Sequence, residues 1–195
     1  MFPKEGEAVP EVRFPEFVEE WENHKLGEVV NIIMGQSPNG ENYTDNSEDY
    51  ILVQGNADIK NGWVLPRVWT TQVTKTAQKG DIILSVRAPV GDVGKTDYDV
   101  VIGRGVAAIQ GNDFIFQLLS KMKNDGFWIK FSTGSTFESI NSTDLREAAI
   151  KIPAQAEQIK IGNFFKQLDQ VIALHEQELE ALQQTKNAFL QKMFV

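Results

Sequence analysis

The chain has 195 residues, of which 42% are hydrophobic and 24% charged, a composition typical of one folded domain with an accessory element. It contains no cysteine, which excludes disulfides and thiolate sites, and its two histidines argue against a zinc site. No apolar run approaches the roughly 20 residues of a membrane span, and the N-terminus has no signal-peptide pattern. We therefore expect a cytoplasmic protein with no metal, no cofactor and no membrane association.

The net charge of −8 is unevenly distributed along the chain. Residues 1–49 carry three basic and twelve acidic side chains, whereas residues 60–104 carry seven basic and four acidic ones. Because a local basic face contacts phosphate whatever the net charge, a nucleic-acid partner remains compatible with this composition. The acidic segment either docks on a basic partner surface or is simply solvated; it includes Glu19, Glu20, Glu22 and Glu28.

Residues 1–26 are charged and contain three prolines, yet they also carry the spaced aromatic residues Phe14, Phe17 and Trp21. This pattern predicts an ordered arm whose aromatic side chains pack on a domain while its acidic side chains face water. We treat residues 1–152 as one domain that includes this arm, and residues 153–195 as a separate helical region.

The middle of the chain is rich in β-branched segments separated by turn-forming residues, which predicts an α+β domain dominated by strands. The predicted strands are Val29–Met34, Tyr50–Gln54, Asp81–Val86, Val100–Ile102, Val106–Gln110 and Ala148–Ile152. Helical spacing over Phe114–Met122 predicts one helix, which ends at Asn124-Asp125-Gly126. Asn61-Gly62 indicates a tight turn, and Pro89, Gly91 and Gly94 indicate a loop after the Asp81–Val86 strand.

The region from about Gln155 to Phe194 contains no proline and a single glycine, which predicts a helix about 60 Å long. Its apolar residues recur at alternating spacings of four and three, a heptad pattern sustained over more than four heptads. The chain contains no second helix of this length, so we expect an intermolecular coiled coil. The alternative is a terminal helix packed across its own domain. The predicted interface residues are Phe165, Leu168, Ile172, His175, Leu179, Leu182, Phe189 and Met193.

No catalytic motif is recognisable in the sequence. The phosphate-binding GxxxxGK[ST] loop, GxGxxG, HExxH and GxSxG are all missing. Asp81 begins a predicted strand, where a turn-capping role is the expected one. We therefore expect a chain that is not an enzyme by itself.

Several polar loops follow the predicted strands and are suited to contact with DNA. Arginine, glutamine and asparagine read base edges, while lysine, serine and threonine contact phosphates. The candidate DNA-binding residues are Gln36, Ser37, Gln54, Asn56, Lys60, Arg67, Lys75, Arg87, Arg104 and Ser135.

The whole chain resembles a known family, the specificity subunits of type I restriction-modification enzymes. The N-terminal motifs that carry the resemblance are Pro10–Phe17, Trp21-Glu22 and Lys25–Glu28. The internal motifs that resemble those of the family's recognition domain are Gly35–Pro38, Lys79–Leu84, Gly91–Gly94 and Gly134–Asn141. The helical run from Ile152-Pro153 through Phe164-Phe165 and Leu168-Asp169 to Leu190–Phe194 is similar to the helix that follows each recognition domain in this family.

The resemblance implies a target recognition domain that binds one half of a bipartite double-stranded DNA target, with no cofactor and no catalytic residues. It also implies partners: methyltransferase subunits and a restriction subunit, which perform the chemistry. Family members usually carry two recognition domains and two long helices that pair antiparallel. The resemblance therefore implies a half-length form, natural or cut by design, whose helix pairs antiparallel with the helix of a second copy.

Two other functions remain open from the residues. One is a coiled-coil adaptor without DNA binding, which would show no salt-sensitive affinity for DNA. The other is the recognition tail of a larger restriction-modification enzyme.

Overall fold

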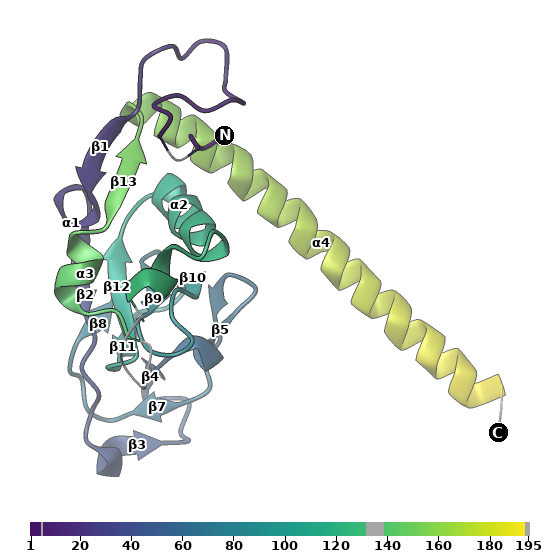
Figure 1. Cartoon of the computed structure of the whole chain (residues 1–195). Helices are drawn as coiled ribbons and strands as arrows, with labels where there is room; N and C mark the ends of the chain where they lie inside the picture. The colour runs from purple at the N-terminus through teal and green to yellow at the C-terminus, as the bar shows by residue number, and fades with distance from the viewer. Residues whose placement is uncertain (5, 132–138, 194–195) are drawn as a thin grey trace.

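The computed structural model describes residues 1–4, 6–131 and 139–193. A strand-rich domain carries one long helix, α4 (Gln155–Met193), which extends well beyond it (Figure 1). The α+β architecture predicted from the sequence is thus confirmed. Within the described residues, no helix is long and apolar enough to cross a membrane.

The central layer is a six-stranded sheet in the order β2-β12-β9-β10-β6-β5. Its strands are Asn31–Met34 (β2), Val106–Gln110 (β12), Ile82–Ser85 (β9), Val93–Lys95 (β10), Trp63–Val64 (β6) and Ile59–Lys60 (β5). β12 pairs antiparallel with β2 on one side and with β9 on the other. The Asn61-Gly62 turn joins β5 to β6, and both residues adopt positive φ, as the sequence predicts.

A second, five-stranded sheet has the order β3-β7-β4-β11-β8. Its strands are Tyr43–Thr44 (β3), Trp69–Thr70 (β7), Tyr50–Val53 (β4), Val100–Ile102 (β11) and Thr76–Ala77 (β8). A separate pair joins β1 (Glu22–Lys25) to β13 (Ala149–Ile152) and so brings residues 22–25 beside the end of the domain.

The centre of the six-stranded sheet is buried on both faces, which explains the continuous apolar run of β9. Ile82 and Leu84 of this strand face one core, whereas Ile83 faces the other. The first core packs under the helices and the N-terminal arm, and the second lies between the two sheets. A strand buried on both faces carries apolar residues at successive positions, here Ile82, Ile83 and Leu84, so its sequence shows no alternation.

Helix α2 (Asp113–Asn124) covers the first core, and the side chain of Asn112 caps it by accepting from the Ile115 amide at 3.0 Å. Its buried residues include Phe114, Leu118 and Met122 at the predicted helical spacing. Two short α-helices complete this layer, α1 (Leu26–Val29) and α3 (Ser142–Arg146). Short 3-10 turns are Gly40–Asn42 (η1), Asn56–Asp58 (η2) and Phe127–Phe131 (η3).

All six strands predicted from the sequence are present, but the loop predicted after β9 is wrong in part. Gly94 lies inside strand β10, which pairs antiparallel with β9. A Cβ atom at Gly94 would lie 2.7 Å from the side chain of Ile59, so the glycine allows β5 to approach this strand closely. Strands β3 and β5–β8 are also not predicted, because two residues carry no periodicity, and β1 is not predicted because all four of its residues are polar.

The N-terminal arm packs its aromatic side chains as predicted. Trp21 is buried, and Phe14 and Phe17 are half-buried. Arg13 makes two hydrogen bonds, at 2.8 and 2.7 Å, to the carboxylate of Glu157, a buried residue in the first turn of α4. The hydrogen bonding to Glu157, together with the charge of that carboxylate, raises the pKa of Arg13 above its ordinary value. The arm therefore fastens the beginning of α4 to the domain.

Helix α4 is 39 residues long, close to the length that the sequence predicts. Only its first turns are buried, at Glu157, Ile161 and Gly162. Figure 1 shows the remainder extending away from the domain as a straight helix, and its contacts with the described part of the domain beyond the aromatic residues are polar ones, at Lys166, Asp169 and Glu176. The alternative of a terminal helix packed across its own domain thus holds for burial only at the start of α4, while polar contacts with the domain reach as far as Glu176.

Candidate nucleic-acid interface

Three of the predicted DNA-binding residues meet at one end of the six-stranded sheet. β2 and β9 both end where their common neighbour β12 begins. Gln36 follows β2, Arg87 follows β9, and Arg104 precedes β12. The Val86 amide donates to the Gly105 carbonyl at 2.8 Å, which places the segments that carry the two arginines next to each other.

The second sheet contacts this cluster at Ile102, the last residue of β11. The Gln36 amide donates to the Ile102 carbonyl at 2.9 Å, and the Ile102 amide donates to the Lys75 carbonyl at 2.8 Å. Ser37 accepts from the Arg104 backbone amide at 3.1 Å. Gln54 follows β4 and joins the cluster, because the Gly103 amide donates to the Val53 carbonyl at 2.8 Å. We call the cluster the strand-end surface; it comprises Gln36, Ser37, Gln54, Lys75, Arg87 and Arg104.

The three basic residues of the strand-end surface are exposed, and the Arg104 side chain also donates from Nε to the Ser37 hydroxyl at 3.4 Å. Three of the four other basic side chains of residues 60–104 lie in ion pairs with aspartates: Arg67, Lys79 and Lys95. In contrast, no carboxylate among residues 1–4, 6–131 and 139–193 forms an ion pair with Lys75, Arg87 or Arg104. Exposed arginine and lysine side chains beside glutamine and serine side chains are suited to hold phosphates and to read base edges.

The remaining predicted DNA-binding residues are placed differently. Arg67 lies beside the η2 turn that begins with Asn56, because its side chain donates to the Ala57 carbonyl at 2.9 Å. Lys60 lies apart from the strand-end surface, because its hairpin packs beside α2 and α4: the side chain of the next residue, Asn61, donates to Glu176 of α4 at 3.3 Å. Ser135 lies outside the described residues.

Two polar residues of this region were not predicted from the sequence. The Tyr43 hydroxyl donates to the Gln54 side chain at 3.3 Å, and the Thr74 hydroxyl donates to the Gln36 carbonyl. Tyr43 also lies on the edge strand β3, and it is exposed. Both contacts join segments at least eleven residues apart, and neither residue has a local motif that would have identified it.

Glycines allow the strand ends to approach one another. A Cβ atom at Gly35 would lie 2.1 Å from the Gly103 carbonyl oxygen, whereas one at Gly40 would meet nothing within 4 Å. We predict that Gly35→Ala lowers the free energy of unfolding by about 3 kcal/mol, or about 10 °C in Tm, because the backbone must shift. Gly40→Ala is the matched control and should change stability by less than about 0.5 kcal/mol. Equal Tm values for the two variants in thermal unfolding would contradict this packing.

The predicted interface residues of α4 fall into two groups. Phe165 packs on its own arm, since its ring stacks on Phe2 with centroids 6.0 Å apart. The others leave their side chains in solvent along the free part of the helix, with Leu168 43% exposed, Leu179 56% and Leu182 61%. We call these residues the free seam: Leu168, Ile172, His175, Leu179, Leu182, Phe189 and Met193.

The side chains that face the domain lie on a different strip of α4. Lys166, Asp169 and Glu176 contact residues of the domain, and they are spaced by three and seven residues. At 100° per residue, this strip is rotated by roughly 90° from the free seam. The domain therefore leaves the free seam open to a second helix.

Comparison with known proteins identifies the family. Residues 18–184 match the model of the type I restriction modification DNA specificity domain. The chain is 33% identical over 183 residues to the putative type I restriction enzyme MjaX specificity subunit of Methanocaldococcus jannaschii, covering 90% of this chain and 43% of that protein. The MjaIX specificity subunit of the same organism is 28% identical over 122 residues, covering 60% of this chain and 28% of that protein.

Solved structures agree with this result. A chain from a study of complex assembly and conformational transition in the type I restriction-modification system matches with a TM-score of 0.73 and 31% identity, over 91% of this chain and 43% of that chain. The HsdS subunit of Thermoanaerobacter tengcongensis matches with a TM-score of 0.69 and 30% identity, over 91% and 42%. The chain thus spans less than half the length of these relatives. It belongs to the family of type I restriction-modification DNA specificity subunits.

Proposed function

We propose that this chain recognises DNA for a type I restriction-modification system and binds one half of a bipartite double-stranded target. The observation that carries the proposal is the presence of two separate free surfaces on one chain. The strand-end surface offers exposed cations that form no ion pair within the described part of the chain, together with amide side chains, and the free seam offers exposed apolar residues at heptad spacing. β12 begins at the first surface and leads directly to α2, which packs on α4.

The strand-end surface would bind the DNA. Arg87 and Arg104 are the residues that we expect to reach base edges or phosphates, since arginine pairs with guanine and binds phosphate in a bidentate manner. Gln36 and Gln54 supply amides of the kind that pair with adenine, and Lys75 and Ser37 supply phosphate contacts.

The free seam would pair with a second copy of the chain in an antiparallel coiled coil. A two-fold axis across α4 would place one recognition domain at each end of the helix pair. Because the two domains would be identical, the dimer would read a palindromic target whose halves are separated by a fixed spacer. The rigid helices would set the length of that spacer.

The chemistry would reside in other subunits. We propose that the paired helices present a surface for methyltransferase subunits and position a restriction subunit, while this chain performs no catalytic step. The exposed acidic side chains of the arm, which include Glu19, Glu20 and Glu22, remain either a docking face for such a subunit or a solvated face.

The proposal is tested by selecting duplexes from a random DNA pool with the purified protein at moderate salt. We expect an enriched palindrome in two halves with a single spacer length. Adding five base pairs to that spacer moves one half-site by about 17 Å and about half a turn, so affinity should fall to that of an isolated half-site. Enrichment of one undivided motif would contradict the dimer model. Weak binding that does not depend on salt would contradict DNA recognition and favour the adaptor.

A further inference from the structure

Helix α4 meets the domain at an apolar contact close to its start. Ile161 is buried in the first core, and Gly162 lies so close to α2 that a Cβ atom would come within 2.9 Å of the Phe114 backbone nitrogen. Among the described residues of α4, Phe165 is the last one that packs against the first core. This contact is short compared with the 39 residues of the helix, so by itself it would leave the helix free to tilt about Gly162.

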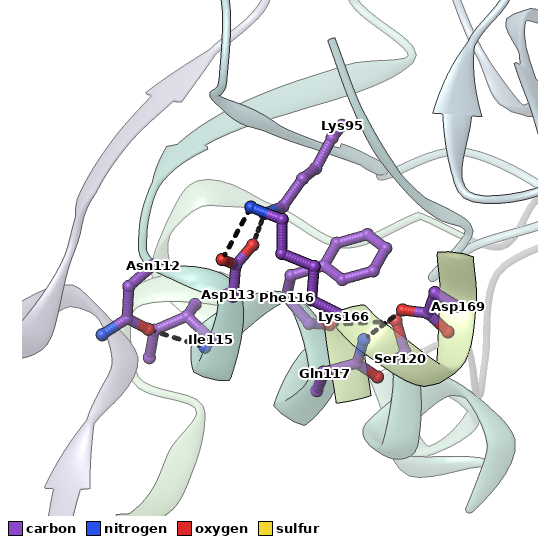
Figure 2. Close-up of polar contacts among 9 residues, drawn as sticks. All are labelled: Lys95, Asn112, Asp113, Ile115, Phe116, Gln117, Ser120, Lys166 and Asp169. Carbon is purple, nitrogen blue, oxygen red and sulfur yellow. Dashed lines mark hydrogen bonds and ion pairs between the residues drawn. The ribbon is translucent and has the colours of Figure 1, made fainter. Parts of the chain in front are cut away.

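Polar contacts continue beyond this apolar contact. Figure 2 shows Lys95 of β10 and Lys166 of α4 both directed at the carboxylate of Asp113, the first residue of α2. Lys166 lies 3.5 Å from the Asp113 carboxylate. One turn further along α4, Asp169 accepts from the Gln117 side chain at 2.7 Å. We call Asp113, Gln117, Lys166 and Asp169 the helix clamp.

The central carboxylate of the helix clamp is held firmly on the domain side. Lys95, whose side chain is 17% exposed, pairs with Asp113 and also lies 5.3 Å from the centre of the Phe116 ring. Partial burial alone would raise the pKa of Asp113, but the hydrogen bond and charge of Lys95, with a smaller share from Lys166, lower the pKa of this carboxyl below its ordinary value. Asp113 is therefore a fixed negative charge that links the sheet to the long helix.

Because α4 is long, a small change in its tilt would change the separation between the two half-sites that the dimer can bind. From Gly162 to Met193 the helix extends about 46 Å at 1.5 Å per residue. A tilt of only about 4° about Gly162 displaces its end by about 3.4 Å, the rise of one base pair. The Lys166 and Asp169 contacts lie one to two turns beyond Gly162, where they oppose such a tilt directly, whereas the contact between Asn61 and Glu176 is a single exposed hydrogen bond of 3.3 Å.

We propose that the helix clamp determines the spacer length that the dimer accepts, because it fixes the angle between the recognition domain and α4. This inference rests on the proposed function. It assigns a specificity-determining role to four residues that need not contact DNA, whereas the bases of each half-site would be read by the strand-end surface.

The test uses the double variant Lys166→Ala/Asp169→Ala in the full chain. It removes one positive and one negative charge, so the net charge and the long-range attraction to DNA are unchanged. Both side chains belong to exposed residues of α4, so the core of the domain is left intact. Gln167→Ala/Gln170→Ala is the matched control, because both glutamines are exposed on the same turns and lie outside the helix clamp. Lys166→Arg with Asp169 retained should restore the wild-type behaviour.

The angle is measured directly by spin labels at Glu48→Cys, in an exposed loop of the domain, and Gln184→Cys on α4. The natural chain has no cysteine, so both labels are unique. Labelled chains are diluted into unlabelled ones, and electron double resonance then reports the distance within one chain. We expect the double variant to broaden this distance distribution by about half, while the control leaves it unchanged.

The consequence for DNA is measured by the same selection from a random duplex pool. We expect the double variant to enrich the wild-type half-site bases with spacers one base pair shorter and longer, within about threefold of the original. A broadened distance distribution with the single wild-type spacer would overturn the inference, as would an unbroadened distribution. Failure of the wild-type protein to enrich any divided target would instead contradict the proposed function, on which the inference rests.

Discussion

The double variant Leu168→Lys/Leu182→Lys is expected to be monomeric at concentrations where the wild-type protein is a dimer. Both leucines lie on the free seam and are exposed in the isolated chain, at 43% and 61%. Pairing with a second copy would bury each of them and stabilise the dimer by about 2 kcal/mol per side chain, whereas a lysine at the same place would bury an unpaired amine. Four substitutions per dimer therefore cost more than about 5 kcal/mol, and the dissociation constant should rise more than about a thousandfold.

Sedimentation at tens of micromolar distinguishes the two states. The matched control is Gln170→Lys/Gln184→Lys, which adds the same charges two positions further along the helix, on the side away from the seam. This control should remain dimeric. A wild-type protein that sediments as a monomer, or a control that dissociates equally, would contradict pairing through the free seam.

The double variant Arg87→Ala/Arg104→Ala is expected to lose specific DNA binding. The two arginines lie on adjacent segments of the strand-end surface, and among the described residues neither pairs with a carboxylate. Each lost contact should cost at least about 1 kcal/mol, so affinity should fall about 30-fold or more. The slope of log affinity against log salt should flatten by about one for each lost phosphate contact, and an arginine that reads a base should instead relax the sequence preference.

The control for this variant removes two positive charges elsewhere. Lys79 precedes β9 and pairs with Asp97, and Lys121 lies on α2 and pairs with Asp125. Lys79→Ala/Lys121→Ala should leave half-site preference unchanged and weaken binding only slightly through net charge. If this control loses as much affinity as the arginine variant in a titration at several salt concentrations, the DNA-binding face lies elsewhere.

The strands show what local patterning can and cannot reveal. Asp81–Val86 was recognisable as a strand from three consecutive apolar residues, but only the structure shows that two different cores require them. Short strands such as Trp63–Val64 and Trp69–Thr70 have two residues each, so they form only because a partner strand supplies the hydrogen bonds. The local sequence predicts a loop at Gly94, because nothing near this residue indicates the approach of Ile59.

The candidate DNA-binding residues divide in the same way. Residue type and position at a strand end identified Gln36, Arg87 and Arg104, which the structure brings to one surface. The same criteria also selected Lys60, which lies beside α4 instead. Strand direction decides between these outcomes: a residue that follows one strand meets a residue that precedes an antiparallel neighbour, and this pairing is not encoded near either residue.

The sequence by itself determined the long helix and its seam, because helix formation and heptad spacing depend on residues within a few turns of one another. The motifs also determined the family resemblance, which the comparisons confirm. Only the tertiary structure decided which cations are already paired, where the arm fastens α4, and which strip of that helix faces the domain. These features depend on contacts between distant segments, such as Arg13 with Glu157 and Asp113 with Lys166, whose energies arise only once the chain has folded.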